Sequence, residues 1–215
     1  MPVEERVARR KSSAERRTEI VSAAAGIFAA HGYAGVGMRD IADAIGIRGA
    51  SLYHHFSSKE EILYAICLTV TQEPVEQNLP LLDAPGTPTD RLTTLVGAHI
   101  RHLLHRRVEY VVGLHERPAL TGEHRADVDQ YLHYYNRRVR DVLVAGMRSG
   151  EFRGLDPGLA ALGILDMLNG VSGWIRGDAD DDADGVVASH TALILGGLGA
   201  GRVGSDHVGE ASSSS

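Results

Sequence analysis

Hydrophobic residues recur at intervals of three and four along most of this 215-residue chain. Ile20, Ala24 and Phe28, for example, repeat every fourth position, which is the spacing of one helical face. The period-two alternation of half-buried strands is hard to find in the sequence. The pattern therefore predicts an all-α fold of about nine helices. The predicted helices cover residues 14–32, 37–45, 48–55, 58–78, 88–105, 107–116, 123–149, 156–176 and 184–198.

Glycine and proline mark the breaks between these helices. Gly32, Gly46 and Gly150 each follow an apolar periodic stretch, where a glycine cap is expected. Asp156 and Pro157 read as the N-cap and the first residue of a helix. Because the first three predicted helices are short and closely spaced, they form a unit distinct from the longer helices that follow.

The stretch "MRDIADAIGIRGASLYHHF" at residues 38–56 predicts a helix-turn-helix. Ile41 and Ile45 lie on one side of the first helix, Gly46 makes the turn, and Leu52 and Phe56 anchor the second helix at i and i+4. In such a motif apolar contacts hold the two helices at a steep angle, and the outer face of the second is free to enter a major groove.

Polar residues populate the outer face and the ends of the second helix. Arg48, Ser51, Tyr53, His54 and His55 are of types that contact phosphates and base edges. His54 and His55 are adjacent and point about 100° apart on a helix, so they cannot form the i, i+4 pair of a helical metal site. The pattern favours DNA binding over metal binding here.

The charge distribution agrees with an anion-binding N-terminal end. The whole chain has a formal net charge of -6, yet residues 1–60 carry nine Lys or Arg against seven Asp or Glu. The remaining 155 residues together have a net negative charge.

The single cysteine, Cys67, excludes an intrachain disulfide and any Cys-rich zinc motif. No run is long and charge-free enough to span a bilayer, so a cytoplasmic protein without membrane contact is expected.

The run from Arg17 to Leu63 closely resembles the N-terminal DNA-binding domain of TetR-family transcriptional repressors. The resemblance implies a homodimer that binds double-stranded operator DNA through this domain and a small-molecule effector through a variable helical body. It also implies that the body's last two helices pair across the dimer. Val36 and Gly37 depart from the family, which often has hydroxyl residues there. The expected DNA-binding residues are Arg39, Arg48, Gly49, Ser51, Tyr53, His54 and Lys59.

Within this set the resemblance places Tyr53 and His54 at the DNA backbone and Lys59 at a phosphate. Arg48, an arginine at the start of the second helix, is the expected base-edge contact. The domains expected are a DNA-binding unit at 14–58 and a ligand-binding and dimerisation body at 59–203. Residues 1–13 and 204–215 are expected to be flexible tails.

The body supplies tyrosines beside apolar residues, which favours an amphiphilic ligand. The segment "SLYHHFSSKEE" is also similar to the corresponding segment of family members that control fatty-acid or sterol breakdown. The effectors of those members are acyl-CoA thioesters, so an acyl-CoA is the first effector expected. The expected ligand-binding residues are Leu95, His99, Leu103, Tyr110, Leu114, Tyr131, Tyr134, Tyr135, Met167 and Trp174.

The dimer is also indicated by the apolar pattern near the C-terminus. Leu159, Leu162 and Leu168 lie on more than one face of the helix predicted at 156–176. A helix that is apolar on several sides must be buried on several sides. Two chains should therefore form a symmetric four-helix interface with the helix at 184–198.

Three alternatives remain open from the sequence. The row His99, His102 and His105 could make the protein a metal-sensing regulator, although zinc would need further ligands that no spacing rule places. The body could be an enzyme or a metal-binding domain fused to a vestigial DNA-binding unit. The third alternative is a constitutive DNA-binding protein without an effector. No catalytic constellation is found, and neither an enzyme activity, a metal nor a cofactor is expected.

Overall fold

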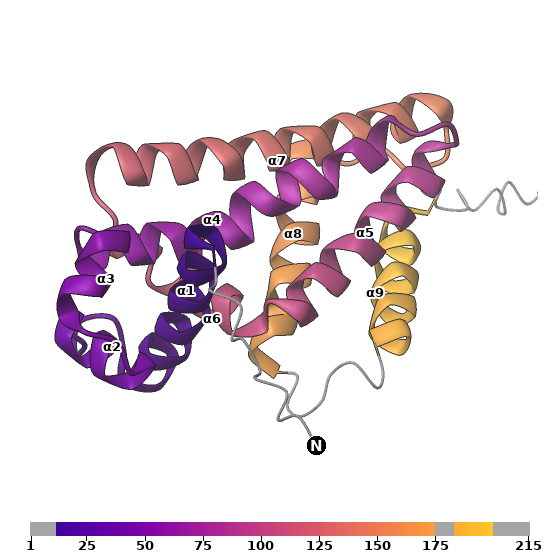
Figure 1. The fold of residues 1–215 in the computed structure, drawn as a ribbon. Helices are drawn as coiled ribbons and strands as arrows, with labels where there is room; N and C mark the ends of the chain where they lie inside the picture. The colour runs from indigo at the N-terminus through magenta and orange to yellow at the C-terminus, as the bar shows by residue number, and fades with distance from the viewer. Residues whose placement is uncertain (1–11, 175–182, 200–215) are drawn as a thin grey trace, which may run out of the picture.

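The computed structural model describes residues 12–174 and 183–199, and over these residues the chain is almost wholly helical (Figure 1). The all-α prediction is confirmed. The helices are α1 (Ser13–His31), α2 (Met38–Ile45), α3 (Gly49–His55), α4 (Lys59–Gln77), η1 (Leu79–Asp83), α5 (Pro88–His105), α6 (Arg107–His115), η2 (Arg117–Ala119), α7 (Gly122–Ser149), α8 (Pro157–Trp174) and α9 (Ala183–Leu198).

Helix ends lie close to the predicted bounds because the signals that set them are local. Ser58 accepts a hydrogen bond from the Glu61 N–H at 3.1 Å, and Asp156 accepts one from the Leu159 N–H at 2.8 Å, as N-caps do. The two short 3-10 helices η1 and η2 were not predicted. Most of the tails predicted at 1–13 and 204–215 lies outside the described residues.

The first three helices form a compact N-terminal unit, and α4 runs from it into the C-terminal body (Figure 1). Apolar residues of α1, α2 and α3 make one core together with the first half of α4. That core also includes Val112, Leu120 and Val128 from α6, the segment after η2, and α7. The N-terminal unit is therefore packed against the body through shared apolar contacts as well as through α4.

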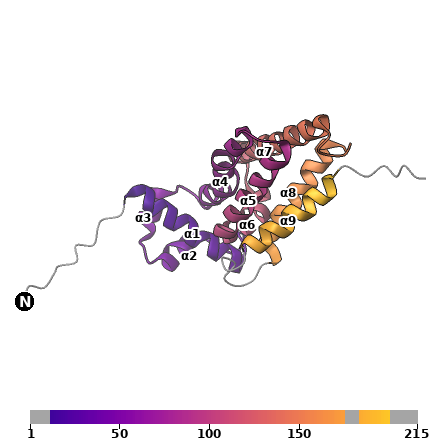
Figure 2. The same ribbon diagram turned by 90° about the vertical axis from the view of Figure 1, so that its right-hand side faces the viewer.

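The body has a second core built from α4 to α9. The long helix α7 packs on α4 and α8, while α9 packs on α5. Figure 2 shows α8 and α9 together on one side of the molecule, away from the N-terminal unit. The last two helices thus lie where a second chain can reach them without covering α2 or α3.

Gly146 in α7 lies directly against the ring of Phe152. A Cβ atom at this position would lie 2.1 Å from a ring carbon of Phe152, which is buried. We expect Gly146→Ala to lower the free energy of unfolding by about 1–3 kcal/mol, because the ring must leave its place in the core. Urea unfolding followed by circular dichroism measures this.

Gly26 in α1 supplies the matched control for Gly146. It is helical and exposed, and a Cβ there would meet nothing within 4 Å. Gly26→Ala should therefore stabilise the protein by about 0.5–1 kcal/mol, through helix propensity alone. A Gly146→Ala protein as stable as the Gly26→Ala protein would contradict the packing described for Phe152.

Candidate DNA interface and ligand pocket

The turn between α2 and α3 has the geometry of a helix-turn-helix. Gly46 has a φ of +71°, in the left-handed region that favours glycine, and ends α2. The Ile47 N–H then donates to the Ala42 carbonyl at 3.0 Å. Leu52 and Phe56 point inward and are buried. With these two side chains inward, the opposite face of α3 is left to solvent.

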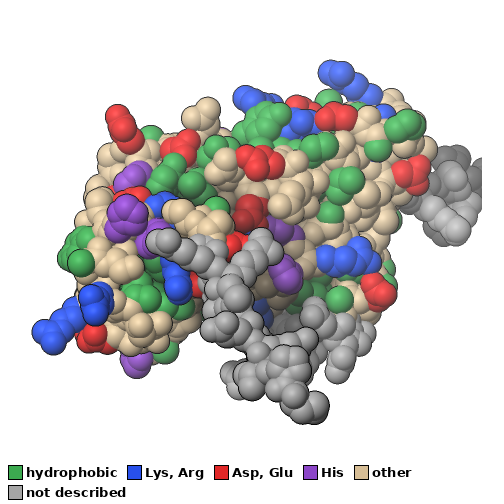
Figure 3. All heavy atoms as spheres, in the orientation of Figure 1, with side chains coloured by type: hydrophobic (Ala, Val, Ile, Leu, Met, Phe, Trp, Pro, Cys, Tyr) green, Lys and Arg blue, Asp and Glu red, His purple; other side chains and the backbone are tan. Residues whose placement is uncertain are grey.

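Six of the seven predicted DNA-binding residues are exposed on α2, on α3 or at the N-cap of α3. Tyr53 is 57% exposed although it is a large hydrophobic side chain, and the side chain of Arg39 is 93% exposed. Histidine and Lys or Arg side chains gather over this end of the molecule in Figure 3. The six residues are Arg39, Arg48, Gly49, Ser51, Tyr53 and His54.

Lys59, the seventh residue, lies in a different environment. Its ammonium donates to the carbonyls of Tyr33 and Val36 at 2.8 and 2.7 Å and lies 4.2 Å from the centre of the Tyr33 ring. These contacts tie the start of α4 to the loop between α1 and α2. A contact between Lys59 and a phosphate stays a prediction, and it would use the third hydrogen of the ammonium.

Arg17 of α1 is a residue of this unit that the sequence analysis missed. Its guanidinium lies 3.9 Å from the centre of the Phe56 ring, donates to the His55 carbonyl and pairs with Glu61 at 3.4 Å. Burial acts to raise the pKa of Glu61, but hydrogen bonds from Ser57 and the charge of Arg17 outweigh it and lower that pKa. Arg17 thereby joins the end of α3 to α1 and α4, over sequence separations that no local pattern reveals.

A pocket of about 40 Å³ lies inside the body. Helices α4, α5, α6, α7 and α8 contribute its walls. Four of the predicted ligand-binding residues, His99, Leu114, Tyr131 and Tyr135, line it. The complete lining is Val70, Thr71, Pro74, His99, Leu114, Tyr131, Leu132, Tyr135, Leu165 and Asn169.

The other predicted ligand residues lie elsewhere. Leu95, Leu103 and Tyr110 are buried in the body core but do not line this pocket. Tyr134 lines a hollow on the surface of α7, and Met167 lines a groove between α8 and α9. The side chain of Trp174 lies outside the described residues. The predicted ligand-binding residues thus lie in three different places: in the wall of this pocket, in the core of the body and on its surface.

His99 is the centre of a polar cluster in the pocket wall. Its Nδ1 lies 3.2 Å from the Tyr135 hydroxyl, and its Nε2 lies 3.2 Å from Oδ1 of Asn169. Burial lowers the pKa of His99 to about 4, so the ring is neutral at pH 7. Because Oδ1 of Asn169 only accepts, Nε2 carries the hydrogen, and the Tyr135 hydroxyl donates to Nδ1.

Asn169, Thr71 and Pro74 are pocket residues that the sequence analysis missed. Asn169 is a lone amide in the apolar helix α8, and Pro74 lies inside α4 rather than at its start. Both are exceptions to the pattern around them and could have been singled out for that reason. Proline lacks the N–H that would bond to the carbonyl of Val70, so α4 is weakened where it lines the pocket.

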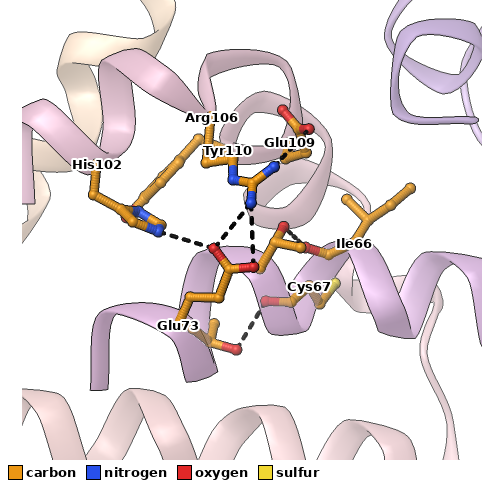
Figure 4. Close-up of polar contacts among 9 residues, drawn as sticks. Ile66, Cys67, Glu73, His102, Arg106, Glu109 and Tyr110 are labelled. Carbon is orange, nitrogen blue, oxygen red and sulfur yellow. Dashed lines mark hydrogen bonds and ion pairs between the residues drawn. The ribbon is translucent and has the colours of Figure 1, made fainter. Parts of the chain in front are cut away.

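A second polar cluster lies between α4 and the α5–α6 corner (Figure 4). His102 Nε2 is 3.3 Å from Glu73, its Nδ1 is 3.1 Å from the Tyr110 hydroxyl, and Arg106 lies 3.4 Å from Glu73. Burial lowers the pKa of His102 even though Glu73 acts to raise it. These contacts hold α4 against α5 and α6 one turn from the pocket.

The histidine row of α5 does not converge on one point. His99 faces the pocket, His102 faces Glu73 of α4, and His105 is exposed. Among the residues that the structure describes, no group of three or more His, Cys, Asp or Glu side chains is placed to hold a metal ion. The geometry gives the metal-sensing alternative no support.

Exposed leucines mark the outer surface of α8 and α9. Leu159 is 71% exposed, Leu162 52% and Leu193 65%, and Leu155 lies just before α8 at 37%. A groove between the two helices is lined mainly by apolar residues and glycines. Contiguous apolar surface of this kind is typical of an interaction face. No helix within the described ranges is long and apolar enough to cross a membrane.

Comparison with known sequence families matches both parts of the chain. The family described as "Bacterial regulatory proteins, tetR family" matches residues 20–66. The family described as "Tetracyclin repressor-like, C-terminal domain" matches residues 85–198. The HTH-type transcriptional repressor KstR2 of Mycobacterium tuberculosis is 32% identical over 188 residues, which span 85% of this chain and 92% of that protein.

Solved structures give the same result. The ketosteroid transcriptional regulator KstR2 of Mycobacterium tuberculosis has a TM-score of 0.80 and 30% identity, over 90% of this chain and 99% of that one. AibR in complex with isovaleryl coenzyme A and operator DNA has a TM-score of 0.70 and 31% identity, over 81% and 97%. The chain therefore belongs to the TetR family of bacterial regulatory proteins, whose members are transcriptional regulators and not enzymes.

Proposed function

We propose that this protein is a cytoplasmic repressor that binds a palindromic operator as a homodimer and is released from it by an amphiphilic effector, with an acyl-CoA as first candidate. The observation that carries the proposal is that one helix, α4, belongs to both sites. Its residues Ile62 and Leu63 lie in the core under the exposed face of α3, and its residues Val70 and Pro74 line the pocket.

The operator side of the proposal is supported by the exposed polar face of α2 and α3. Each N-terminal unit presents one such face, so a two-fold dimer presents two. A palindromic operator mirrors this symmetry, with one half-site for each second helix. The exposed leucines of α8 and α9 supply an apolar surface for the dimer contact.

The effector side is supported by the pocket and by the relatives. AibR was crystallised with isovaleryl coenzyme A, and a fatty acid metabolism regulator protein from Bacillus subtilis is 24% identical over 87% of this chain. The pocket lining contains no charged side chain. An acyl group can therefore enter, whereas the phosphates of coenzyme A would lose their hydration without a partner and must stay outside.

Release follows from the size of the pocket. About 40 Å³ is well below the roughly 300–1,000 Å³ of typical ligand pockets, so binding of an acyl group would widen the pocket. Part of that wall is α4 at Pro74, where a backbone hydrogen bond is missing. Movement of α4 would carry the N-terminal unit out of register with the operator. The coupling requires differential affinity of the effector for the two arrangements, typically about 1–3 kcal/mol.

Substitution of Arg48 tests most directly whether α3 contacts DNA bases. We expect Arg48→Ala to weaken binding to a palindromic operator by about 1–3 kcal/mol and to change binding to random duplexes much less, because a base-edge contact is lost. An operator selected from a random library and titrated at several salt concentrations measures this. Arg101→Ala, at an exposed arginine of the body, is the matched control. Unchanged affinity of the Arg48→Ala protein for every duplex would contradict the proposed interface.

Effector release is tested separately with a panel of long-chain acyl-CoAs. We expect a binding member to raise the melting temperature and to lower operator affinity about 5- to 150-fold, which corresponds to the coupling energy above. Fluorescence anisotropy on a labelled operator records the release. If no acyl-CoA does either, the effector class is wrong, while the repressor proposal stands on the operator titrations.

A further inference from the structure

The pocket has a polar group that its own hydrogen bonds leave unused. Asn169 accepts from His99 through Oδ1 at 3.2 Å, and its side chain lines the pocket. Its Nδ2 carries two hydrogens, and no group of the described residues accepts either of them in a hydrogen bond. Asn169 therefore presents a donor to whatever occupies the pocket.

Of the four other polar side chains in the pocket wall, His99, Tyr135 and Thr71 are already hydrogen-bonded, whereas the Tyr131 hydroxyl makes no hydrogen bond to another described residue. The neutral His99 ring donates through Nε2 to Asn169 and accepts through Nδ1 from the Tyr135 hydroxyl. The Thr71 hydroxyl donates to the Cys67 carbonyl at 2.8 Å. Turning the Tyr135 hydroxyl toward a ligand would leave Nδ1 of the buried His99 ring without a partner, which is costly. The hydrogen-bonded series Tyr135–His99–Asn169 thus turns Oδ1 of Asn169 toward His99 and leaves the amide nitrogen for a ligand.

The charge of the lining restricts the ligand further. Five apolar residues and five uncharged polar residues form the wall, and burial keeps His99 neutral. A carboxylate in this pocket would have no cation to pair with and would lose its hydration. A carbonyl oxygen needs only a donor, and the Asn169 amide supplies one.

We propose that Asn169, held in place by His99 and Tyr135, recognises an uncharged carbonyl oxygen on the part of the effector that enters the pocket. This inference rests on the proposed function, since it assigns the chemical class that the effector pocket selects. Two sources of such a carbonyl exist in an acyl-CoA, namely the thioester itself and a ketone carried by the acyl group. Both present the same oxygen to the same amide.

Two substitutions separate the donor role of Asn169 from its structural role. Asn169→Asp keeps the size and the acceptor for His99 but replaces the amide donor by a carboxylate; because this also adds a charge beside His99, its effect is measured as the difference between matched probes. Asn169→Leu removes donor and acceptor together and leaves Nε2 of His99 without its partner, so it is also expected to be less stable. Leu165→Met, four residues earlier on α8 and also in the pocket wall, changes the shape with little change in volume and serves as the control.

The full-length proteins are titrated with matched probes by calorimetry. Octanoyl-CoA and the thioether S-octyl-CoA differ in the thioester carbonyl, and 7-oxooctanoyl-CoA adds a ketone. The pair 1-tetralone and tetralin differs by one carbonyl oxygen without any coenzyme A. Against the wild-type protein, we expect at least one carbonyl probe to bind about tenfold more tightly than its carbonyl-free partner. Asn169→Asp should remove that difference, whereas Leu165→Met should keep it.

The pattern of results identifies the source of the carbonyl. A preference for octanoyl-CoA over S-octyl-CoA assigns the thioester, and a preference for 7-oxooctanoyl-CoA over octanoyl-CoA assigns a ketone. Asn169-dependent binding of 1-tetralone with no binding of any CoA derivative would keep this inference and overturn the acyl-CoA part of the proposed function. If no carbonyl probe shows an Asn169-dependent preference, including the case in which none binds, the inference is overturned.

Discussion

Leu159→Asp is expected to convert the dimer into monomers and to abolish operator binding. Leu159 is 71% exposed on α8, next to the groove shared with α9, and in a symmetric interface the same leucine is buried twice. Two unpaired carboxylates in an apolar interface cost several kcal/mol each. The dimer dissociation constant should therefore rise by more than about 1,000-fold.

Sedimentation and operator titration together measure this effect. A monomer has only one helix-turn-helix, so it can bind only one half-site of the operator. It therefore loses the affinity gained by binding both half-sites at once, even when its N-terminal unit is folded. Val108→Asp, at an apolar residue of α6 that is 42% exposed, adds the same charge outside the α8–α9 face and should leave the dimer intact. A dimeric Leu159→Asp protein, or a wild-type protein that is monomeric at micromolar concentration, would rule out this interface.

Phe56→Ala is expected to unfold the N-terminal unit. The Phe56 ring is 1% exposed at the end of α3, and the Arg17 guanidinium covers one face of it. Truncating a buried phenylalanine costs about 3–5 kcal/mol, and Arg17 would also lose its cation–π contact. Binding to operator and to random duplexes should be lost together. Hydrogen exchange should show amides of α2 and α3 that open more often than those of α7.

Tyr53→Ala is the matched control, since Tyr53 lies on α3, three residues before Phe56, and is 57% exposed. The Tyr53→Ala protein should have the same urea midpoint of unfolding as the wild-type protein and should lose only affinity for DNA. The comparison separates loss of the fold from loss of a contact. Phe56→Ala protein that keeps wild-type exchange in α2 and α3 would show that Phe56 does not anchor the second helix.

The DNA-binding face could be predicted because its parts are close in sequence. The apolar anchors Leu52, within α3, and Phe56, its C-cap, lie within four residues of the exposed Tyr53 and His54, so helical periodicity separates buried from exposed positions. The caps at Ser58 and Asp156 likewise depend on residues three positions away. Where a structural feature depends only on residues within one helical turn, the sequence pattern is enough to predict it.

Lys59 shows the limit of that reasoning even within the N-terminal unit. Family resemblance placed it at a phosphate, but its ammonium also binds two carbonyls about 25 residues earlier in the chain. Arg17 and its partners are 38 to 44 residues apart. Contacts of this kind follow from how α1 packs on α4, which no periodicity encodes.

The pocket depended on tertiary structure almost entirely. Tyr134 and Tyr135 are adjacent and equivalent in the sequence, yet Tyr135 hydrogen-bonds to His99 inside the body and Tyr134 meets Arg138 on the surface. They point about 100° apart, so only the rotation of α7 about its axis decides which one faces inward. Asn169 became a candidate only when α8 packed beside α5 and brought it to His99.

The sequence by itself determined the all-α class, the helix ends and the helix-turn-helix, because apolar spacing, capping and turn residues act within a few positions. The apolar pattern also predicts that a second chain covers α8 and α9. Only the tertiary structure decided which side chains line the pocket and which hydrogens they leave free. Those properties depend on the packing of five helices drawn from residues 70 to 169, and packing is set by side-chain shape across long sequence separations.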